Sequence, residues 1–167
     1  RSDEWDAYVD VNQRFAVRIA NVAPQNAAVW IHDYHLQLVP AVLRELRADV
    51  RIGWFNHIPF PPLELFERLP WRDEIMRGLL GADVIGFQRR HGATNFVAAS
   101  HHLLGAAEID DGLVHFDGRN ISVGAYPISI DVADFELQAS GRAARQRTAQ
   151  IRSRLGDPEV ILLGVDR

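Results

Sequence analysis

Hydrophobic residues follow two alternating spacings along the chain, and this alternation predicts an α/β fold. Apolar residues recur every three or four positions in five segments, as in amphipathic helices: residues 5–22, 38–46, 71–80, 91–104 and 133–155. Shorter runs rich in β-branched and aromatic residues predict strands: residues 28–31, 51–56, 83–87, 113–116, 120–126 and 159–165. Alternating strands and helices at this spacing predict a mostly parallel sheet with helices on both faces.

Two connections carry a turn signal. Residues 57–70 (HIPFPPLELFERLP) predict a stiff loop with a short helical turn, because each proline restricts itself and the residue before it. Asp117 and Gly118 separate two strand-like runs, which predicts a hairpin.

The composition is that of an ordinary globular domain. Of the 167 residues 47% are apolar and none is cysteine, which excludes disulfides and thiolate metal sites. The net charge of −4 gives no general attraction to nucleic acid. No apolar run approaches the roughly 20 residues of a membrane-spanning helix, and the charged opening RSDEWD is unlike a leader peptide. We therefore expect a cytoplasmic protein without nucleic-acid or membrane partners.

Both ends of the sequence predict a longer protein. The chain opens within a helical pattern and closes on VILLGVDR, an apolar strand pattern that a loop and a helix ordinarily follow. We therefore expect these residues to be part of a larger protein.

Polar residues gather where three predicted strands end. Residues 32–35 (HDYH) follow the first strand, Asn56 and His57 close the second, and residues 88–90 (QRR) follow the third. Ligands of parallel α/β sheets bind outside the carboxyl ends of the strands. These clusters, far apart in sequence, are therefore expected to meet at one edge and form a site for a polar ligand.

Asp33 has several roles open to it. As a carboxylate it can act as a general base, a metal ligand or an acceptor of hydrogen bonds from a polyhydroxyl substrate. It can equally be the N-cap of the helical segment that follows, since aspartate is a favoured capping residue.

The histidines are weaker signals for a metal. His32, His35 and His57 could ligate zinc, but their spacing is not a characteristic zinc pattern and no HExxH motif is present. We expect at least one of His32 and His35 to hydrogen-bond a backbone carbonyl. His57 opens the proline-rich loop, which would fix its side chain for positioning a reactive sugar carbon. A rigid loop that merely covers the core is the alternative.

Other polar groups carry less information. His101 and His102 fall late in a helix and suit its negative end. Arg89 and Arg90 are adjacent and do not both face one ligand. The arginines of residues 142–154 predict a solvated helix face. No glycine-rich phosphate loop and no GxSxG motif is present.

Five stretches, in this order and spacing, make the chain resemble the trehalose-6-phosphate synthases. They are WIHDYHLQLVP, RIGWFNHIPFPPLELFERLPW, LLGADVIGF, AYPISID and LLGVDR, and the resemblance runs from residue 5 to residue 167. The family comprises retaining glycosyltransferases with two Rossmann-like domains, the GT-B architecture. The resemblance implies that residues 1–158 form most of the N-terminal, acceptor-side domain, whose own N-terminal part is missing. Residues 159–167 would be the first strand of the C-terminal, nucleotide-sugar-binding domain, whose remainder is absent.

The resemblance also implies an activity. Glucose would move from a nucleotide sugar, usually UDP-glucose, to glucose 6-phosphate, giving α,α-trehalose 6-phosphate with retention and without a metal or other cofactor. Asp33 would contact glucose 6-phosphate, His57 the donor glucose with a bearing on anomer selectivity, and Arg167 the nucleotide-sugar phosphates. The isolated 167 residues would be inactive, because the cleft needs its second wall.

Alternatives remain open at this point. A pseudoglycosyltransferase coupling cyclitol units would share these motifs, and so would a non-catalytic, synthase-like regulatory subunit, although the latter would be expected to lose site residues. A metal-dependent hydrolase is a more distant alternative. The sequence leaves the preferred nucleotide and the oligomeric state open, a homo-oligomer included.

Overall fold

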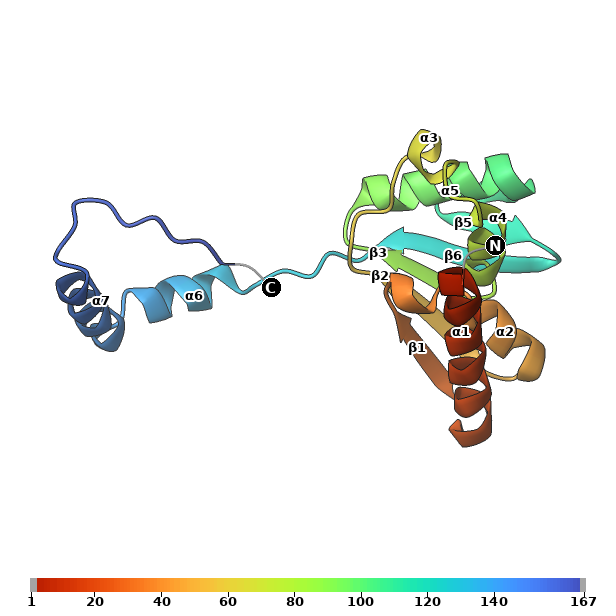
Figure 1. Cartoon of the computed structure of the whole chain (residues 1–167), viewed down its shortest axis with the longest axis horizontal. Coiled ribbons are helices and arrows are strands. Elements are labelled where there is room, and N and C mark those ends of the chain that lie inside the picture. The colour runs from red at the N-terminus through yellow and green to blue at the C-terminus, as the bar shows by residue number, and fades with distance from the viewer. Residues whose placement is uncertain (1–2, 166–167) are drawn as a thin grey trace. The chain divides into compact units, whose positions relative to one another are not determined.

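The computed structural model describes residues 3–165, which divide into two compact units between Pro127 and Ile128. Among the described residues, only the first unit contains strands, and the second contains two helices (Figure 1). No helix within residues 3–165 combines the length and apolar character needed to cross a membrane.

The first unit holds a six-stranded sheet and its helices. In chain order its elements are α1 (Asp3–Val22), β1 (Ala28–His32), the 3-10 helix η1 (Tyr34–Leu36), α2 (Val39–Leu46), β2 (Arg51–Asn56), α3 (Leu63–Phe66), α4 (Arg72–Leu79), β3 (Val84–Phe87), α5 (Arg90–Leu104), β4 (Ala107–Asp110), β5 (Leu113–Phe116) and β6 (Arg119–Ala125). The strand order is β1-β2-β3-β6-β5-β4.

Four neighbouring strands of this sheet run parallel. β1 pairs with β2, β2 with β3 and β3 with β6. Beyond β6 the sheet continues with two antiparallel pairs, β6 with β5 and β5 with β4. The β5–β6 turn is the expected hairpin, with positive φ at both Asp117 (49°) and Gly118 (73°). The carboxyl ends of β1, β2, β3 and β6 consequently share one edge, which confirms the mostly parallel α/β fold.

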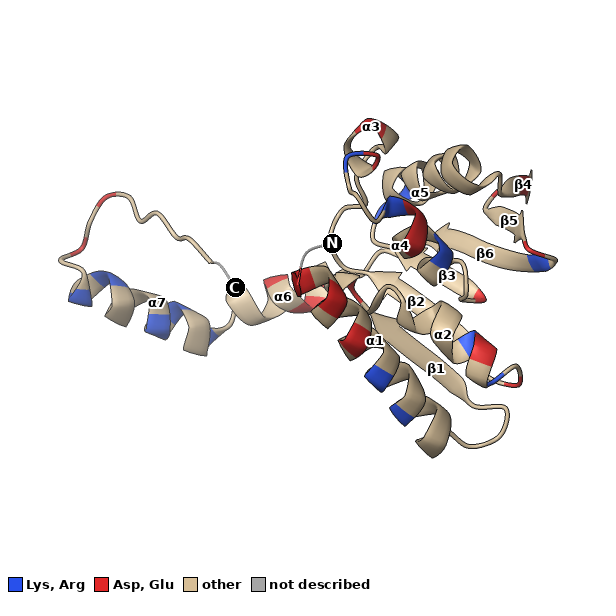
Figure 2. Ribbon diagram, turned by 45° about the vertical axis from the view of Figure 1, so that its right-hand side comes forward, with Lys and Arg blue, Asp and Glu red and all other residues tan. Residues whose placement is uncertain are grey.

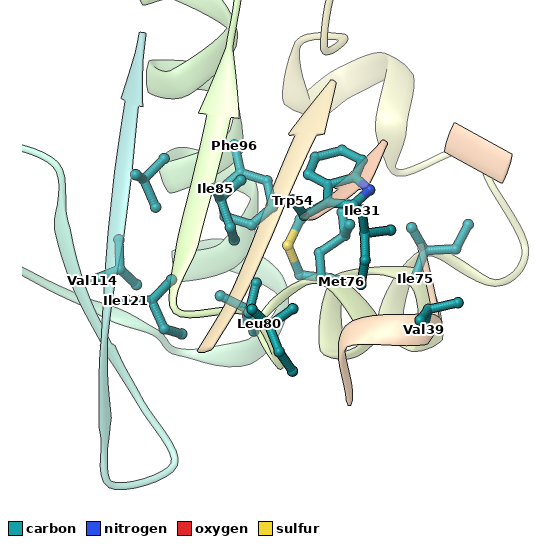
Figure 3. Packing of buried hydrophobic residues seen from close by; sticks show 14 of the residues in the cluster. Ile31, Val39, Trp54, Ile75, Met76, Leu80, Ile85, Phe96, Val114 and Ile121 are labelled. Atoms are coloured by element: carbon teal, nitrogen blue, oxygen red, sulfur yellow. The ribbon is translucent and has the colours of Figure 1, made fainter. Parts of the chain in front are cut away.

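One face of the sheet carries the hydrophobic core. Trp54 of β2, Ile85 of β3 and Met76 of α4 are each at most 1% exposed, and Figure 3 shows them in one packed layer. α4 contacts both α2 and α5, so the helices form a continuous cover. Each large side chain buried in this way stabilises the fold by about 1.5–3 kcal/mol.

The opposite face of the sheet is open within the first unit, residues 3–127. Trp30 is 69% exposed and Val84 is 41% exposed, although both belong to strands of the parallel part of the sheet. A Cβ built on Gly86 would lie 2.6 Å from Phe55 Cδ2 and 3.1 Å from Tyr126 Cδ2, so these two rings lie directly over that glycine. The helices of the first unit therefore cover one face, whereas the sequence predicted helices on both.

The sheet is pinned at the edge opposite to the strand carboxyl ends. Asp83, just before β3, accepts hydrogen bonds from Arg44 (2.6 Å), Arg119 (2.7 Å) and the Ile52 N–H (2.7 Å). The contacts join α2, β2 and β6 to one carboxylate. Charge-assisted bonds of this kind are stronger than neutral ones.

Three sequence-based expectations about elements were wrong or incomplete. β4 was not predicted, because its run of only four residues is short and all four are exposed. The single helix predicted over residues 133–155 is two helices, α6 (Val132–Ala139) and α7 (Arg142–Arg154). The break falls where the Ser140 hydroxyl donates to the Leu137 carbonyl (3.0 Å) and Gly141 is extended, with ψ 155°.

The predicted strand at residues 159–165 is also absent. This segment is exposed and unpaired, since unit 2 has no described strand that could complete its hydrogen-bond ladder. The helix that precedes this segment does carry the expected arginines. The sequence of α7 is RAARQRTAQIRSR, and Figure 2 shows basic but no acidic positions along it.

A second ionic cluster fastens the end of α1. The Arg47 guanidinium donates to both carboxylate oxygens of Asp49, at 2.7 and 2.8 Å, and to the Ala20 carbonyl at 2.8 Å. The Asn26 N–H adds a further bond to Asp49 (2.8 Å). The bonds from Arg47, followed by the one from Asn26, hold the pKa of Asp49 far below its ordinary 3.8.

This shift predicts an acid-dependent contribution to stability. A lowered pKa in the folded state means that the Asp49 carboxylate stabilises the fold above pH 3.8 and loses this effect as the pH falls further. We expect Asp49→Asn to lower the Tm at neutral pH, with the deficit shrinking below pH 3.8. Thermal melts at a series of pH values measure this deficit in Tm. Asp73→Asn is the control, because Asp73 Oδ1 lies 3.8 Å from Arg72 Nε, a much looser ion pair. A deficit that does not change with pH would contradict the assignment.

Candidate functional site

The backbone at Asp33 is strained. Asp33 follows β1 directly and has φ 68° and ψ 174°, a conformation open almost only to glycine. A residue with a side chain held there costs about 1–3 kcal/mol and persists only where its surroundings enforce it. Because such residues cluster at functional sites, the edge of the sheet at Asp33 is a candidate site.

The neighbouring strand enforces this conformation. The Asp33 N–H donates to the Phe55 carbonyl (2.8 Å), and the buried indole of Trp54 donates to the Asp33 carbonyl (3.2 Å). Both peptide groups of the strained residue are thereby satisfied from β2. Trp54 is 1% exposed, so its indole is itself fixed by the core.

Helix α1 fixes the segment that follows. The Tyr8 hydroxyl donates to the Tyr34 carbonyl (2.7 Å) and accepts from the Gln37 N–H (3.1 Å). Asn12, fully buried, donates to the His35 carbonyl at 3.1 Å and accepts from the Leu38 N–H at 3.0 Å. Burial raises the pKa of Tyr8, which keeps its hydroxyl a hydrogen-bond donor.

The Asp33 side chain does not cap the following helix. Asp33 occupies the N-cap position of η1 but makes no side-chain capping bond. Its Oδ1 accepts instead from the backbone N–H of His57, at 3.3 Å. The half-buried carboxylate therefore belongs to a contact between the ends of β1 and β2, as the sequence predicted for these two residues.

The loop after β2 is stiff and anchored. Asn56 donates from its side chain to the Ile58 carbonyl (2.9 Å), and Asn95 of α5 donates to the Phe60 carbonyl (3.1 Å). Phe60 is 3% exposed and packs against Phe66, with ring centroids 5.1 Å apart. Both ends of the HIPF segment are thus tied to the core, and His57 is placed at its start.

The His57 ring pairs with another ring. His32 Nδ1 lies 3.0 Å from His57 Nε2, a hydrogen-bond distance between ring nitrogens. We expected at least one of the His32 and His35 rings to bond a backbone carbonyl, but the contacts of the described residues show such a bond for neither. For His35, the described contact of the ring is a stack on Tyr34, 4.0 Å between centroids. Sequence reasoning did not find the His32–His57 pair, because no spacing rule marks it.

The remaining predicted groups lie elsewhere or outside the described residues. Arg89 is the extended residue that precedes α5, and Arg90 lines a cavity of about 690 Å³ between α5, β4 and β6. Asp33 and His57 do not line that cavity. Arg167 lies outside residues 3–165. Within those residues no group of three histidine or carboxylate side chains could hold a metal ion.

Together, these features define a class of protein. A mostly parallel α/β sheet whose carboxyl edge joins a carboxylate to a histidine is typical of a Rossmann-like domain, a class of fold whose ligands bind at that edge. A family model described as Glycosyltransferase family 20 matches residues 1–167. The chain belongs to glycosyltransferase family 20.

Individual relatives agree. The chain is 53% identical to a trehalose-6-phosphate synthase of Mycolicibacterium vanbaalenii, over 98% of this chain and 35% of the relative. It is similar to a solved alpha,alpha-trehalose 6-phosphate synthase from Burkholderia multivorans, with TM-score 0.82, 32% identity, and 93% of this chain and 34% of that chain covered. A structure described as "Trehalose-6-phosphate from E. coli bound with UDP-2-fluoro glucose" gives TM-score 0.79, 31% identity, and coverage of 91% and 34%.

These comparisons confirm the fold class, a Rossmann-like α/β domain of the GT-B type. The chain spans about a third of the length of the relatives that it matches.

The strain at Asp33 predicts that a glycine variant is more stable than an alanine variant, the reverse of the usual order. Asp33→Gly and Asp33→Ala both remove the carboxylate, but only glycine adopts this backbone conformation freely. We expect Asp33→Gly to be more stable than Asp33→Ala by about 1–2 kcal/mol, which is the strain minus the entropy lost by glycine. Urea unfolding measures the difference. An alanine variant as stable as the glycine variant would mean that the backbone is unstrained.

Proposed function

We propose that this protein transfers glucose from a nucleotide sugar, UDP-glucose by preference, to glucose 6-phosphate, and forms α,α-trehalose 6-phosphate with retention. One observation carries the proposal: the Asp33 carboxylate and the His57 backbone meet at the carboxyl edge of the sheet. Membership of glycosyltransferase family 20 supports the reaction class.

In this proposal Asp33 binds the acceptor. Its Oδ1 is engaged by the His57 N–H, and the other carboxylate oxygen keeps lone pairs for sugar hydroxyls. A bond from a hydroxyl to a charged carboxylate contributes about 1.5–3 kcal/mol. The rigid peptide at Asp33 fixes the direction of that bond before the sugar arrives.

His57 contacts the donor glucose and orients it for attack. The C1–O bond to the nucleoside diphosphate breaks and a C1–O bond to the acceptor forms on the same face of the donor sugar. The proton of the acceptor hydroxyl leaves with the departing diphosphate. Holding both sugars in one geometry is the largest contribution a stiff site can make.

The wider assignments rest on the same proposal. Arg167 binds the diphosphate, where a guanidinium offsets the charge that develops on the leaving group. We assign residues 1–158 to the acceptor-side domain and residues 159–167 to the nucleotide-sugar-binding domain. Residues 159–165, which are unpaired in the described part of the chain, would become the first strand of that domain when a neighbouring strand completes their hydrogen-bond ladder. The relative that carries UDP-2-fluoro glucose supports a uridine nucleotide as the donor. A cytoplasmic location fits sugar-phosphate substrates.

Substitution of Asp33 tests the proposal. In the full-length protein, Asp33→Asn should reduce transfer to glucose 6-phosphate by about 10- to 100-fold, the effect of one charge-assisted bond. The fold should persist, because the amide oxygen can still accept from the His57 N–H. The assay compares UDP-, GDP- and ADP-glucose and identifies the disaccharide phosphate that forms. Asp10→Asn, at an exposed residue of α1, is the control.

Near-normal turnover in the Asp33→Asn variant would refute the role of Asp33. If the wild-type protein couples cyclitols but does not use glucose 6-phosphate, the proposed substrates are wrong. The proposed position of the site would still hold.

A further inference from the structure

Two consecutive residues at the end of β1 hold His57 from two sides. Asp33 accepts from the backbone N–H of His57, and the ring of His32, the residue before, meets the ring of His57. The ring-to-ring distance is 3.0 Å between Nδ1 of His32 and Nε2 of His57. Within residues 3–165, His32 is thus the hydrogen-bonding partner that the fold supplies to the His57 ring.

The pair belongs to a row of four aromatic rings on the open face of the sheet. Trp30 and His32 have centroids 4.7 Å apart, His32 and His57 5.2 Å, and His57 and Phe55 4.9 Å. The parallel register places His32 beside Phe55, and side chains two residues apart share a face. The row therefore follows from the strand pairing and ends at the proposed sugar site.

Stacking and hydrogen bonding constrain the two histidine rings in different ways. Stacking fixes the plane of each ring but not which nitrogen carries its proton. A hydrogen bond between two neutral imidazoles needs one donor and one acceptor nitrogen, so the pair shares one proton. Either ring can be the donor, so the contact couples the two tautomers, and in both arrangements Nδ1 of His57 is the ring nitrogen left for a ligand.

We propose that His32 is a positioning residue for transfer: it holds His57 by Nε2 and so sets the orientation in which that ring meets the donor sugar. This inference rests on the proposed function for its effect on turnover. The hydrogen bond at Nε2 of His57 is a property of the folded protein and can be measured without substrate.

Two substitutions separate the hydrogen bond from the stack. His32→Phe keeps an aromatic ring in the row and removes the nitrogen, whereas His32→Asn removes the ring and keeps an amide group near the position of Nδ1. His32 is exposed, so neither change opens a hole in the core. His102→Phe, at an exposed histidine of α5 that pairs with Glu67, is the matched control.

The first measurement is the nitrogen NMR spectrum of the imidazoles in the full-length protein, above the pH range in which imidazoles protonate. We expect Nε2 of His57 in the wild type to show the chemical shift of a hydrogen-bonded nitrogen. His32→Phe should give the mixed signal of a free imidazole, and His32→Asn should restore the bonded signal. An unchanged His57 signal in His32→Phe overturns the proposal, whatever the activity.

The second measurement is turnover in the same variants. His32→Phe should lower kcat about tenfold, the value of one hydrogen bond, with the KM for the acceptor changed less than about twofold. His32→Asn should recover most of the loss, and His102→Phe should match the wild type. In a His57→Ala background, His32→Phe should cause no further loss, because His32 acts only through His57. A full additional loss there would overturn the proposal.

A wild-type protein without any glucose transfer would refute the proposed function alone, since the NMR result would still decide the role of His32 in fixing His57.

Discussion

The peptide of Asp33 is the constraint on which the site depends. Its conformation is one that a side chain disfavours, and it persists because β2 bonds both of its peptide groups, through the Phe55 carbonyl and the Trp54 indole. Trp54 can do this because the core holds it. The stability of the whole sheet is thus used to keep one carboxylate in an unfavourable but defined place, as expected where function needs preorganisation.

The strained peptide of Asp33 also determines the geometry at the carboxyl edge of the sheet. The strained turn ends β1 and aims the carboxylate at the start of the HIPF loop, where His57 donates its N–H. Prolines, the buried Phe60 and the amide of Asn95 stiffen that loop. Two groups that lie 24 residues apart in the chain therefore act as one unit.

The sequence predicted the parallel strands and the meeting of Asp33 with His57, because hydrophobic period and the geometry of parallel sheets determine both. It could not predict β4, whose residues are all exposed, or the break at Gly141 within an arginine-rich helical pattern. The His32–His57 pair and the strain at Asp33 were also beyond it, since both depend on the register between β1 and β2. The roles of Asp33, His57 and Arg167 in binding remain proposals from the family resemblance.

The most direct measurement is a crystal structure of the full-length protein with glucose 6-phosphate and an unreactive analogue of UDP-glucose. Both sugars should lie at the carboxyl edge of the sheet. The free oxygen of Asp33 should be about 2.5–2.7 Å from an acceptor hydroxyl, and the His57 ring should face the donor glucose. Sugars bound at another edge, with Asp33 and His57 facing only water, would contradict the proposed site.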